Sequence, residues 1–169
     1  MLIEPHFNIE ALKPVNEALL AVGAAALDEL EVGGIEAGLF LEREVKERTP
    51  VGVGGAGGLR GSITSHTGRI GVERIETVVG TPSPYAVPVE LGARPHFPPI
   101  IPLVDWVIHK LGVNPDAARG VAFLVARKIA TKGTKAVMMF TRSLEASQAQ
   151  IETIYIRRAE QALSEIGGR

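Results

Sequence analysis

The β-prone residues of this chain are confined to one stretch, 59–81, where apolar and polar residues alternate as they do in half-buried strands. The phase of the alternation changes near Glu73-Arg74, and a bulge or turn there would reconcile the two halves. Thr67-Gly68 is a second turn signal, expected to lead one strand into the next. The sequence therefore predicts a strand pair within this stretch.

Helical periodicity occupies the chain on both sides of these strands. Residues 14–48 carry an apolar residue every three or four positions, and Thr49-Pro50 ends the pattern because a residue before proline avoids the α region. Gly33-Gly34 interrupts the pattern and is expected to break or kink the helix. The length favours one domain. We expect a single domain over 1–169 that is helical over 14–48, β-rich over 59–92 and helical over 102–166.

The second half contains well-marked helix boundaries. Asn114-Pro115-Asp116 is an N-cap followed by a first-turn proline and an acidic residue, and Lys132-Gly133 is typical of a helix end. The residues expected to face inward in the helix 102–111 are Leu103, Val104, Val107 and Leu111, and the apolar residues of the next helix are Val121, Leu124, Val125 and Ile129.

Charge is distributed unevenly along a chain whose net charge is only −1. Residues 1–49 contain ten acidic and four basic side chains, whereas residues 107–142 contain seven basic and one acidic. Two interpretations remain open: two solvated helix faces, or a head-to-tail contact between copies. The candidate subunit-interface residues are Glu29, Glu36 and Glu44 on the acidic side and Arg127, Lys128 and Lys132 on the basic side.

The glycine-rich stretch 52–61 has neither the lysine of a phosphate-binding loop nor the strand-then-helix context of a dinucleotide fingerprint. We expect instead a loop that is mobile in a free subunit and ordered by a neighbour. The candidate partner-docking residues in it are Gly52, Gly54, Gly58 and Arg60.

Residues suited to catalysis or metal binding are scarce. The chain has no cysteine, no two histidines at helical ligand spacing and no nucleophile elbow. No catalytic, cofactor-binding or metal-binding residue is predicted, although a small hydrolase using Ser62 with His66 or His96 remains a minor alternative. No stretch of about 18 apolar residues is present, so no membrane span is expected.

The order of several short motifs is informative. They are Glu47-Arg48-Thr49-Pro50-Val51-Gly52, Gly58-Leu59-Arg60-Gly61-Ser62-Ile63, Tyr85-Ala86, Val89-Glu90-Leu91-Gly92, Phe97-Pro98-Pro99, Pro102-Leu103, Trp106-Val107, Arg127-Lys128-Ile129 and Lys132-Gly133-Thr134. In this order they resemble the HK97 gp10-type family of bacteriophage neck and tail-completion proteins. Mu-type virion morphogenesis proteins share a similar order.

This resemblance implies an α+β fold in which a long helix packs on a small antiparallel sheet, with additional C-terminal helices. It also implies a structural virion protein without catalysis or cofactors, assembled as a ring at the head–tail joint. A six-fold ring contacting connector and tail-tube proteins, with DNA passing through its lumen, is the expected assembly. The expected location is the virion neck, and the host cytoplasm during assembly.

Within this resemblance the motif residues are expected to serve packing rather than chemistry. Tyr85, Phe97 and Trp106 would be packing anchors, and Glu90 would accept backbone hydrogen bonds or face a neighbouring subunit. The main alternative is a nucleic-acid-binding module. Its binding residues would be Arg119, Arg127, Lys128, Lys132 and Lys135.

Overall fold

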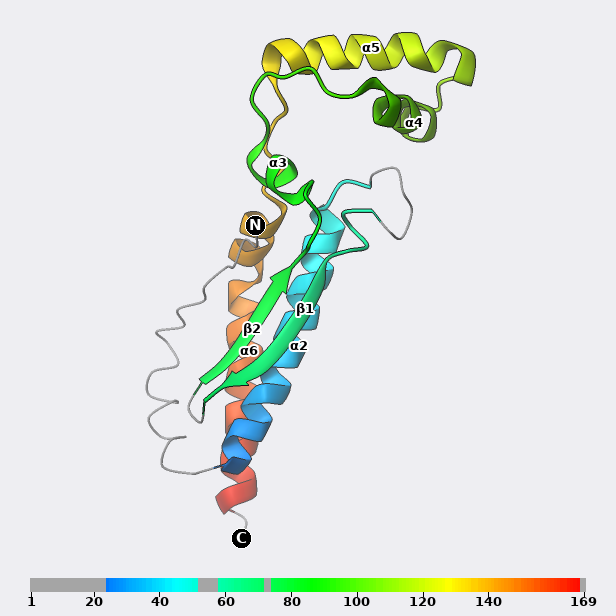
Figure 1. Ribbon diagram of the computed structural model, residues 1–169. Coiled ribbons are helices and arrows are strands. Elements are labelled where there is room, and N and C mark those ends of the chain that lie inside the picture. Colours follow the sequence, from blue (N-terminus) through cyan, green and yellow to red (C-terminus); the bar gives the residue numbers. More distant parts are fainter. Residues whose placement is uncertain (1–23, 52–57, 72–73, 168–169) are drawn as a thin grey trace. The chain divides into compact units, whose positions relative to one another are not determined.

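The computed structural model of the chain describes residues 24–51, 58–71 and 74–167 (Figure 1). The elements are α2 (Ala24–Arg48), β1 (Thr64–Ile70), β2 (Arg74–Gly80), α3 (Ala86–Leu91), α4 (Ile100–Leu111), α5 (Pro115–Lys132) and α6 (Met139–Gly167). The expected α+β class is confirmed: in this part of the chain five helices accompany a two-stranded antiparallel sheet, and α2 packs against that sheet. The predicted helix before Ala24 lies outside the described residues.

The described chain divides into two compact units that alternate along the sequence. The hairpin unit contains residues 24–45, 64–71, 74–80 and 142–167, and therefore most of α2 and α6 with both strands. The α4–α5 unit contains residues 46–51, 58–63 and 81–141.

The sheet of the hairpin unit is a single antiparallel pair. Thr64 lies opposite Gly80 and Ile70 opposite Arg74, so the chain reverses between Ile70 and Arg74, as the phase change predicted. The expectation of a turn at Thr67-Gly68 is wrong, because both residues lie inside β1. Thr67 pairs across the sheet with Thr77, and their hydroxyl oxygens are 3.0 Å apart. Cross-strand pairing therefore outweighs the local preference of Thr67-Gly68 for a turn.

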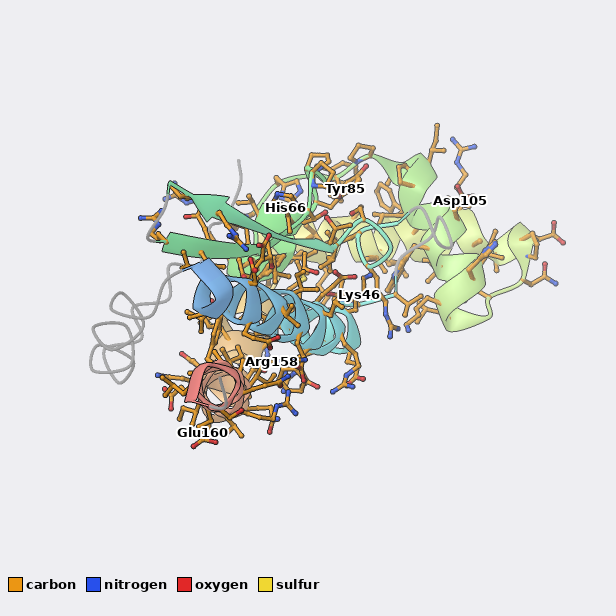
Figure 2. The ribbon with its side chains drawn as sticks, turned by 90° about the horizontal axis from the view of Figure 1, so that it is seen from below. Lys46, His66, Tyr85, Asp105, Arg158 and Glu160 are labelled. Carbon is orange, nitrogen blue, oxygen red and sulfur yellow. The ribbon has the colours of Figure 1, made fainter. Side chains whose placement is uncertain are left out.

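Glycines on two faces of α2 allow its neighbours to approach closely. The hairpin, α2 and α6 form three successive layers (Figure 2). A Cβ atom added to Gly34 would lie 2.7 Å from a methyl carbon of Thr67, and one added to Gly38 would lie 2.9 Å from a methyl carbon of Thr77. Gly33 faces α6 instead, where an added Cβ would be 3.2 Å from Cγ of Arg158. The expected break at Gly33-Gly34 is therefore wrong: α2 is continuous, because packing on both faces outweighs the low helix propensity of glycine.

The same packing changes which α2 residues are buried. Ile35 and Leu39, which continue the apolar periodicity, are exposed, whereas Ala37, Leu41 and Val45 are buried. Apolar spacing therefore identified Leu41 and Val45 correctly but not Ile35 and Leu39, since small residues mark the side where the neighbours come closest.

In the α4–α5 unit, the predicted boundaries of α5 are confirmed. The Asn114 side chain accepts a hydrogen bond from the backbone N–H of Asp116 at 3.0 Å, and the N–H of Gly133 closes the last turn on the carbonyl of Ile129. Leu124 of this helix is exposed, and in α4 the expected inward orientation of Leu111 is wrong, because that side chain is 51% exposed. The residues of α5 that are buried are Ala118, Ala122 and Ala126.

A buried carboxylate fixes the start of α6. Glu90 of α3 is 2% exposed, and it accepts hydrogen bonds from the N–H of Phe140 at 2.9 Å, the N–H of Thr141 at 2.9 Å and the hydroxyl of Thr141 at 2.7 Å. These N–H groups belong to the first turn of the helix and have no partner within it. A residue fifty positions away thus performs the role of an N-cap, and the expectation that Glu90 accepts backbone hydrogen bonds is confirmed.

Two glycines let the chain segments around this cap cross closely. Ala93 and Thr134 exchange backbone hydrogen bonds of 3.2 and 2.9 Å. Gly92 has φ of 77° and Gly133 has φ of 67°. A Cβ at Gly133 would lie 2.0 Å from the carbonyl oxygen of Ala93. Both conformation and space therefore require glycine at this crossing.

Replacing Gly38 with alanine should destabilise the hairpin unit, although alanine is the better helix former. We expect Gly38→Ala to lower the free energy of unfolding by about 1–2 kcal/mol, because overpacking against Thr77 and Ser65 exceeds the propensity gain. Gly120→Ala in α5 is the matched control, since an added Cβ there meets no atom within 4 Å, and it should stabilise by about 0.5–1 kcal/mol. Urea unfolding measures both, and equal effects of the two substitutions would contradict the packing argument.

Removing the Glu90 carboxylate should lower the free energy of unfolding more than removing one of the groups that donate hydrogen bonds to it. Glu90→Ala leaves the buried N–H of Phe140 and the partly buried N–H of Thr141 without an acceptor, and we expect a loss of about 2–4 kcal/mol in the free energy of unfolding. Thr141→Val removes only the hydroxyl bond and should cost about 1 kcal/mol. The denaturation midpoints test this order, and an unchanged midpoint for Glu90→Ala would show that the cap is not needed.

Candidate subunit interface

The acidic residues of α2 are bound by arginines within the hairpin unit. Glu36 accepts hydrogen bonds from Arg158 at 3.1 and 3.3 Å and also from Arg157, while Arg158 reaches Glu29 at 3.3 Å. Figure 2 shows Arg158 on the α2 side of α6 and Glu160 on the far side. The acidic interface candidates Glu29 and Glu36 therefore already have cationic partners in their own chain.

The hairpin neutralises further carboxylates of the same helix. Arg69 of β1 forms ion pairs with Glu31 at 2.6 Å and with Asp28. Glu42 accepts from both the N–H and the hydroxyl of Ser65, each at 2.7 Å, and so covers part of the outer edge of β1. The third candidate, Glu44, lies 3.5 Å from Arg43.

These contacts shift the titration of the groups involved. The hydrogen bond from Arg157 has the largest effect and lowers the pKa of Glu36; burial opposes it, and Arg158 adds to the lowering. The Glu36 carboxylate correspondingly raises the pKa of Arg158. On the hairpin side of α6, burial raises the pKa of Tyr155, and a hydrogen bond with Thr77 opposes that effect.

The basic candidates have a different environment. Arg127, Lys128 and Lys132 are exposed on α5, and none of their side chains has a hydrogen bond or ion pair within the part of the chain that the structure describes. The described carboxylates Asp28, Glu29, Glu31 and Glu36 of α2 are thus paired with arginines, whereas these three cations of α5 have no ion pair among the described residues.

Two of the three expected packing anchors are at the surface. Tyr85 is 66% exposed and Phe97 is 53% exposed, so their assignment as anchors is wrong. Phe97 instead lies against Phe123, itself 49% exposed, with ring centroids 6.1 Å apart. Trp106 is partly buried against the cluster around Val107, as expected.

The motif residues around the glycine-rich stretch are structural. Leu59 and Ile63 are buried, and the buried hydroxyl of Thr49 lies 3.2 Å from the sulfur of Met139. The docking candidates Gly52 and Gly54 lie outside the described residues. Of the other two, Gly58 accepts a backbone hydrogen bond from Ser62, and Arg60 is exposed.

The geometry gives no support to a serine hydrolase. The Ser62 hydroxyl hydrogen-bonds the carbonyl of Leu59 at 2.9 Å and the hydroxyl of Thr81 at 2.6 Å, rather than a histidine. His96 contacts the carbonyl of Arg94. Among the described residues, no group of three or more acidic or histidine side chains is placed to hold a metal ion.

None of the helices that the structure describes between residues 24 and 167 is long and apolar enough to cross a bilayer.

Comparison with known protein families, curated proteins and solved structures found no match to this chain. The resemblance to neck and tail-completion proteins therefore rests on the order of the short motifs alone.

Acid should weaken the link between α2 and α6. Because the folded-state pKa of Glu36 is below its usual value of 4.5, the stabilisation is present above about pH 4.5 and is lost as the pH falls through the lower folded value. Glu36→Gln should lower the free energy of unfolding by about 0.5–1 kcal/mol at pH 7, since the group is partly exposed, and by less at pH 3.

The matched control is Glu160→Gln, which removes an exposed carboxylate from the far face of α6. Its stability should follow that of the unmodified protein at each pH. A pH-independent effect of Glu36→Gln would show that the ion pair does not contribute in the way described.

Proposed function

We propose that this chain is a structural protein of a bacteriophage neck or tail, which assembles as a ring of identical subunits at the head–tail joint. The observation that carries the proposal is that motifs similar to those of neck and tail-completion proteins lie close together in the α4–α5 unit. Val89-Glu90-Leu91-Gly92 and Lys132-Gly133-Thr134, forty residues apart, meet around the start of α6. The motifs that are similar to the family thus act together as scaffold.

The surface of the α4–α5 unit supports an assembling role. Contiguous exposed apolar surface is typical of interaction sites, and Phe97 lies against Phe123 in this unit, which exposes nine large apolar side chains among its described residues. They are Val51, Tyr85, Leu91, Phe97, Ile101, Leu111, Phe123, Leu124 and Met138. A ring subunit needs two different surfaces that fit each other, and uncompensated basic residues of α5 would steer one of them.

The intrachain pairing of Glu29 and Glu36 bears on how a ring would close. A neighbour's basic helix would have to compete with Arg157 and Arg158 for these carboxylates. The contact between acidic and basic segments therefore stays a prediction, and the apolar surface is the stronger source of affinity.

A nucleic-acid-binding module remains the second candidate. The observation in its favour is that the exposed cations of α5 have no partner in the described chain. DNA binding through them would show a steep loss of affinity with salt in a mobility-shift experiment. The apolar side chains exposed between the cations favour a protein partner instead.

Assembly is measured by light scattering and electron microscopy of the purified protein. We expect closed rings with a central opening, and weaker assembly for Arg127→Glu than for Arg74→Glu, which makes the same charge change at the end of the hairpin. Added salt should weaken association of the unmodified protein. A monomer at every concentration, with no binding to phage tails, would refute the proposed function.

A further inference from the structure

The outward face of α5 combines three features that point to a bound partner. The helix buries Ala118, Ala122 and Ala126, so helical spacing places Gly120, Phe123, Leu124 and Arg127 on the opposite side. Together with Phe97, which contacts Phe123, these four residues are called the α5 face. Its first feature is the exposure of Leu124, at 61%, next to the half-exposed aromatic pair.

The second feature is Gly120. A glycine in the interior of an exposed helix destabilises it by about 1 kcal/mol relative to alanine. The glycines of α2 have a packing reason, because side chains of the hairpin or of α6 lie against them, whereas a Cβ at Gly120 would meet no atom within 4 Å. The bare backbone at Gly120 leaves room for a partner to come close beside Phe123.

The third feature is the pair of arginines around Phe123. Arg119 and Arg127 lie one helical turn before and after it, and both are exposed with no partner among the described residues. Aromatic and arginine side chains are enriched in protein interfaces. The α5 face therefore suits a partner with large apolar side chains flanked by carboxylates.

The first twelve residues of this chain have that composition. They contain no lysine or arginine, two glutamates (Glu4 and Glu10), and five large apolar residues besides Met1. The five are Leu2, Ile3, Phe7, Ile9 and Leu12. They also precede Pro14, where the sequence predicts a helix to begin.

We infer that residues 1–12 of one copy bind the α5 face of a neighbouring copy, with Phe7 beside Phe123 and the two glutamates near Arg119 and Arg127. Six extended residues span up to about 20 Å, which exceeds the roughly 12 Å that separates two helical positions eight residues apart. One segment can therefore reach both arginines. The inference rests on the proposed self-assembly and names the contact that links adjacent subunits.

Two other arrangements would differ from this contact: nucleic acid on the α5 face, or residues 1–12 bound elsewhere. Nucleic acid would use the arginines but would leave Leu124 and the aromatic pair in water, so the apolar content of the face favours a protein segment. Alternatively the same twelve residues could lie on the exposed apolar side of α2, at Ile35 and Leu39. The arginines that lie against α2 are already paired with its carboxylates, whereas the side chains of Arg119 and Arg127 have no partner among the described residues, so α5 is the better match for Glu4 and Glu10.

The absence of cysteine allows a direct test by disulfide trapping in the full chain. One copy carries Asn8→Cys, and a second copy, distinguished by an affinity tag, carries Gly120→Cys. Under mild oxidation we expect disulfide-linked dimers that contain both copies. The matched control replaces the second copy with Thr153→Cys, an exposed position on α6, and should give few such dimers.

Charge reversal then tests the pairing. Glu4→Arg with Glu10→Arg should reduce the yield of trapped dimer about tenfold, since two exposed pairs turn from attractive to repulsive. Adding Arg119→Glu and Arg127→Glu to the second copy should restore it. A disulfide between Asn8→Cys and Leu39→Cys of the same chain, in place of the dimer, would overturn the inference. Loss of trapping on adding duplex DNA would equally overturn it in favour of a nucleic-acid surface.

The results separate this contact from the proposed function. Rings that form while Asn8→Cys and Gly120→Cys fail to link would refute the contact between residues 1–12 and the α5 face but leave the proposed ring in place. Linked pairs that never exceed a dimer would refute the ring and leave this contact in place.

Discussion

The Glu90 carboxylate joins segments of the α4–α5 unit that are far apart in the sequence. It is a charged group almost without exposure, and such a group is tolerated only where hydrogen bonds replace water. Two backbone N–H groups and one hydroxyl at the start of α6 supply them. Because helix N-termini favour negative charge, the pairing satisfies both partners at once. The crossing at Gly92 and Gly133 brings the two segments close enough for it.

A second feature of this chain is that carboxylates of α2 form ion pairs with arginines of the same unit. The acidic surplus of residues 1–49 suggests a strongly negative surface, but α2 lies between a hairpin and a helix that each contribute arginines. Arg69 serves one side and Arg158 the other, so much of the surplus is neutralised where it arises. The cations of α5 are not matched in this way. Segment charge is therefore a poor guide to surface charge until the packing partners are known.

Small residues define the packing surfaces more sharply than large ones do. Gly34 and Gly38 admit the threonines of the hairpin, and alanines of α5 form its buried face. Large apolar residues that continue the helical period, such as Leu39 and Leu124, are left in contact with solvent. Because small residues are buried while some large apolar residues are exposed, periodicity located the helices correctly but assigned some of their faces wrongly. It also leaves apolar surface for the interactions that we propose.

The sequence by itself determined the elements that depend on local chemistry. The end of α2 before Thr49-Pro50 and both ends of α5 follow from steric and capping preferences that act within a few residues. The alternation predicted the strand pair, but the turn expected at Thr67-Gly68 is wrong, since register is set across the sheet and both residues lie inside β1. Only the tertiary structure decided which helix faces are buried, that Glu36 binds Arg157 and Arg158, and that Tyr85 and Phe97 lie at the surface. Those outcomes depend on which segments meet in space, and contacts between residues about fifty to over one hundred positions apart leave no periodic signal in the sequence.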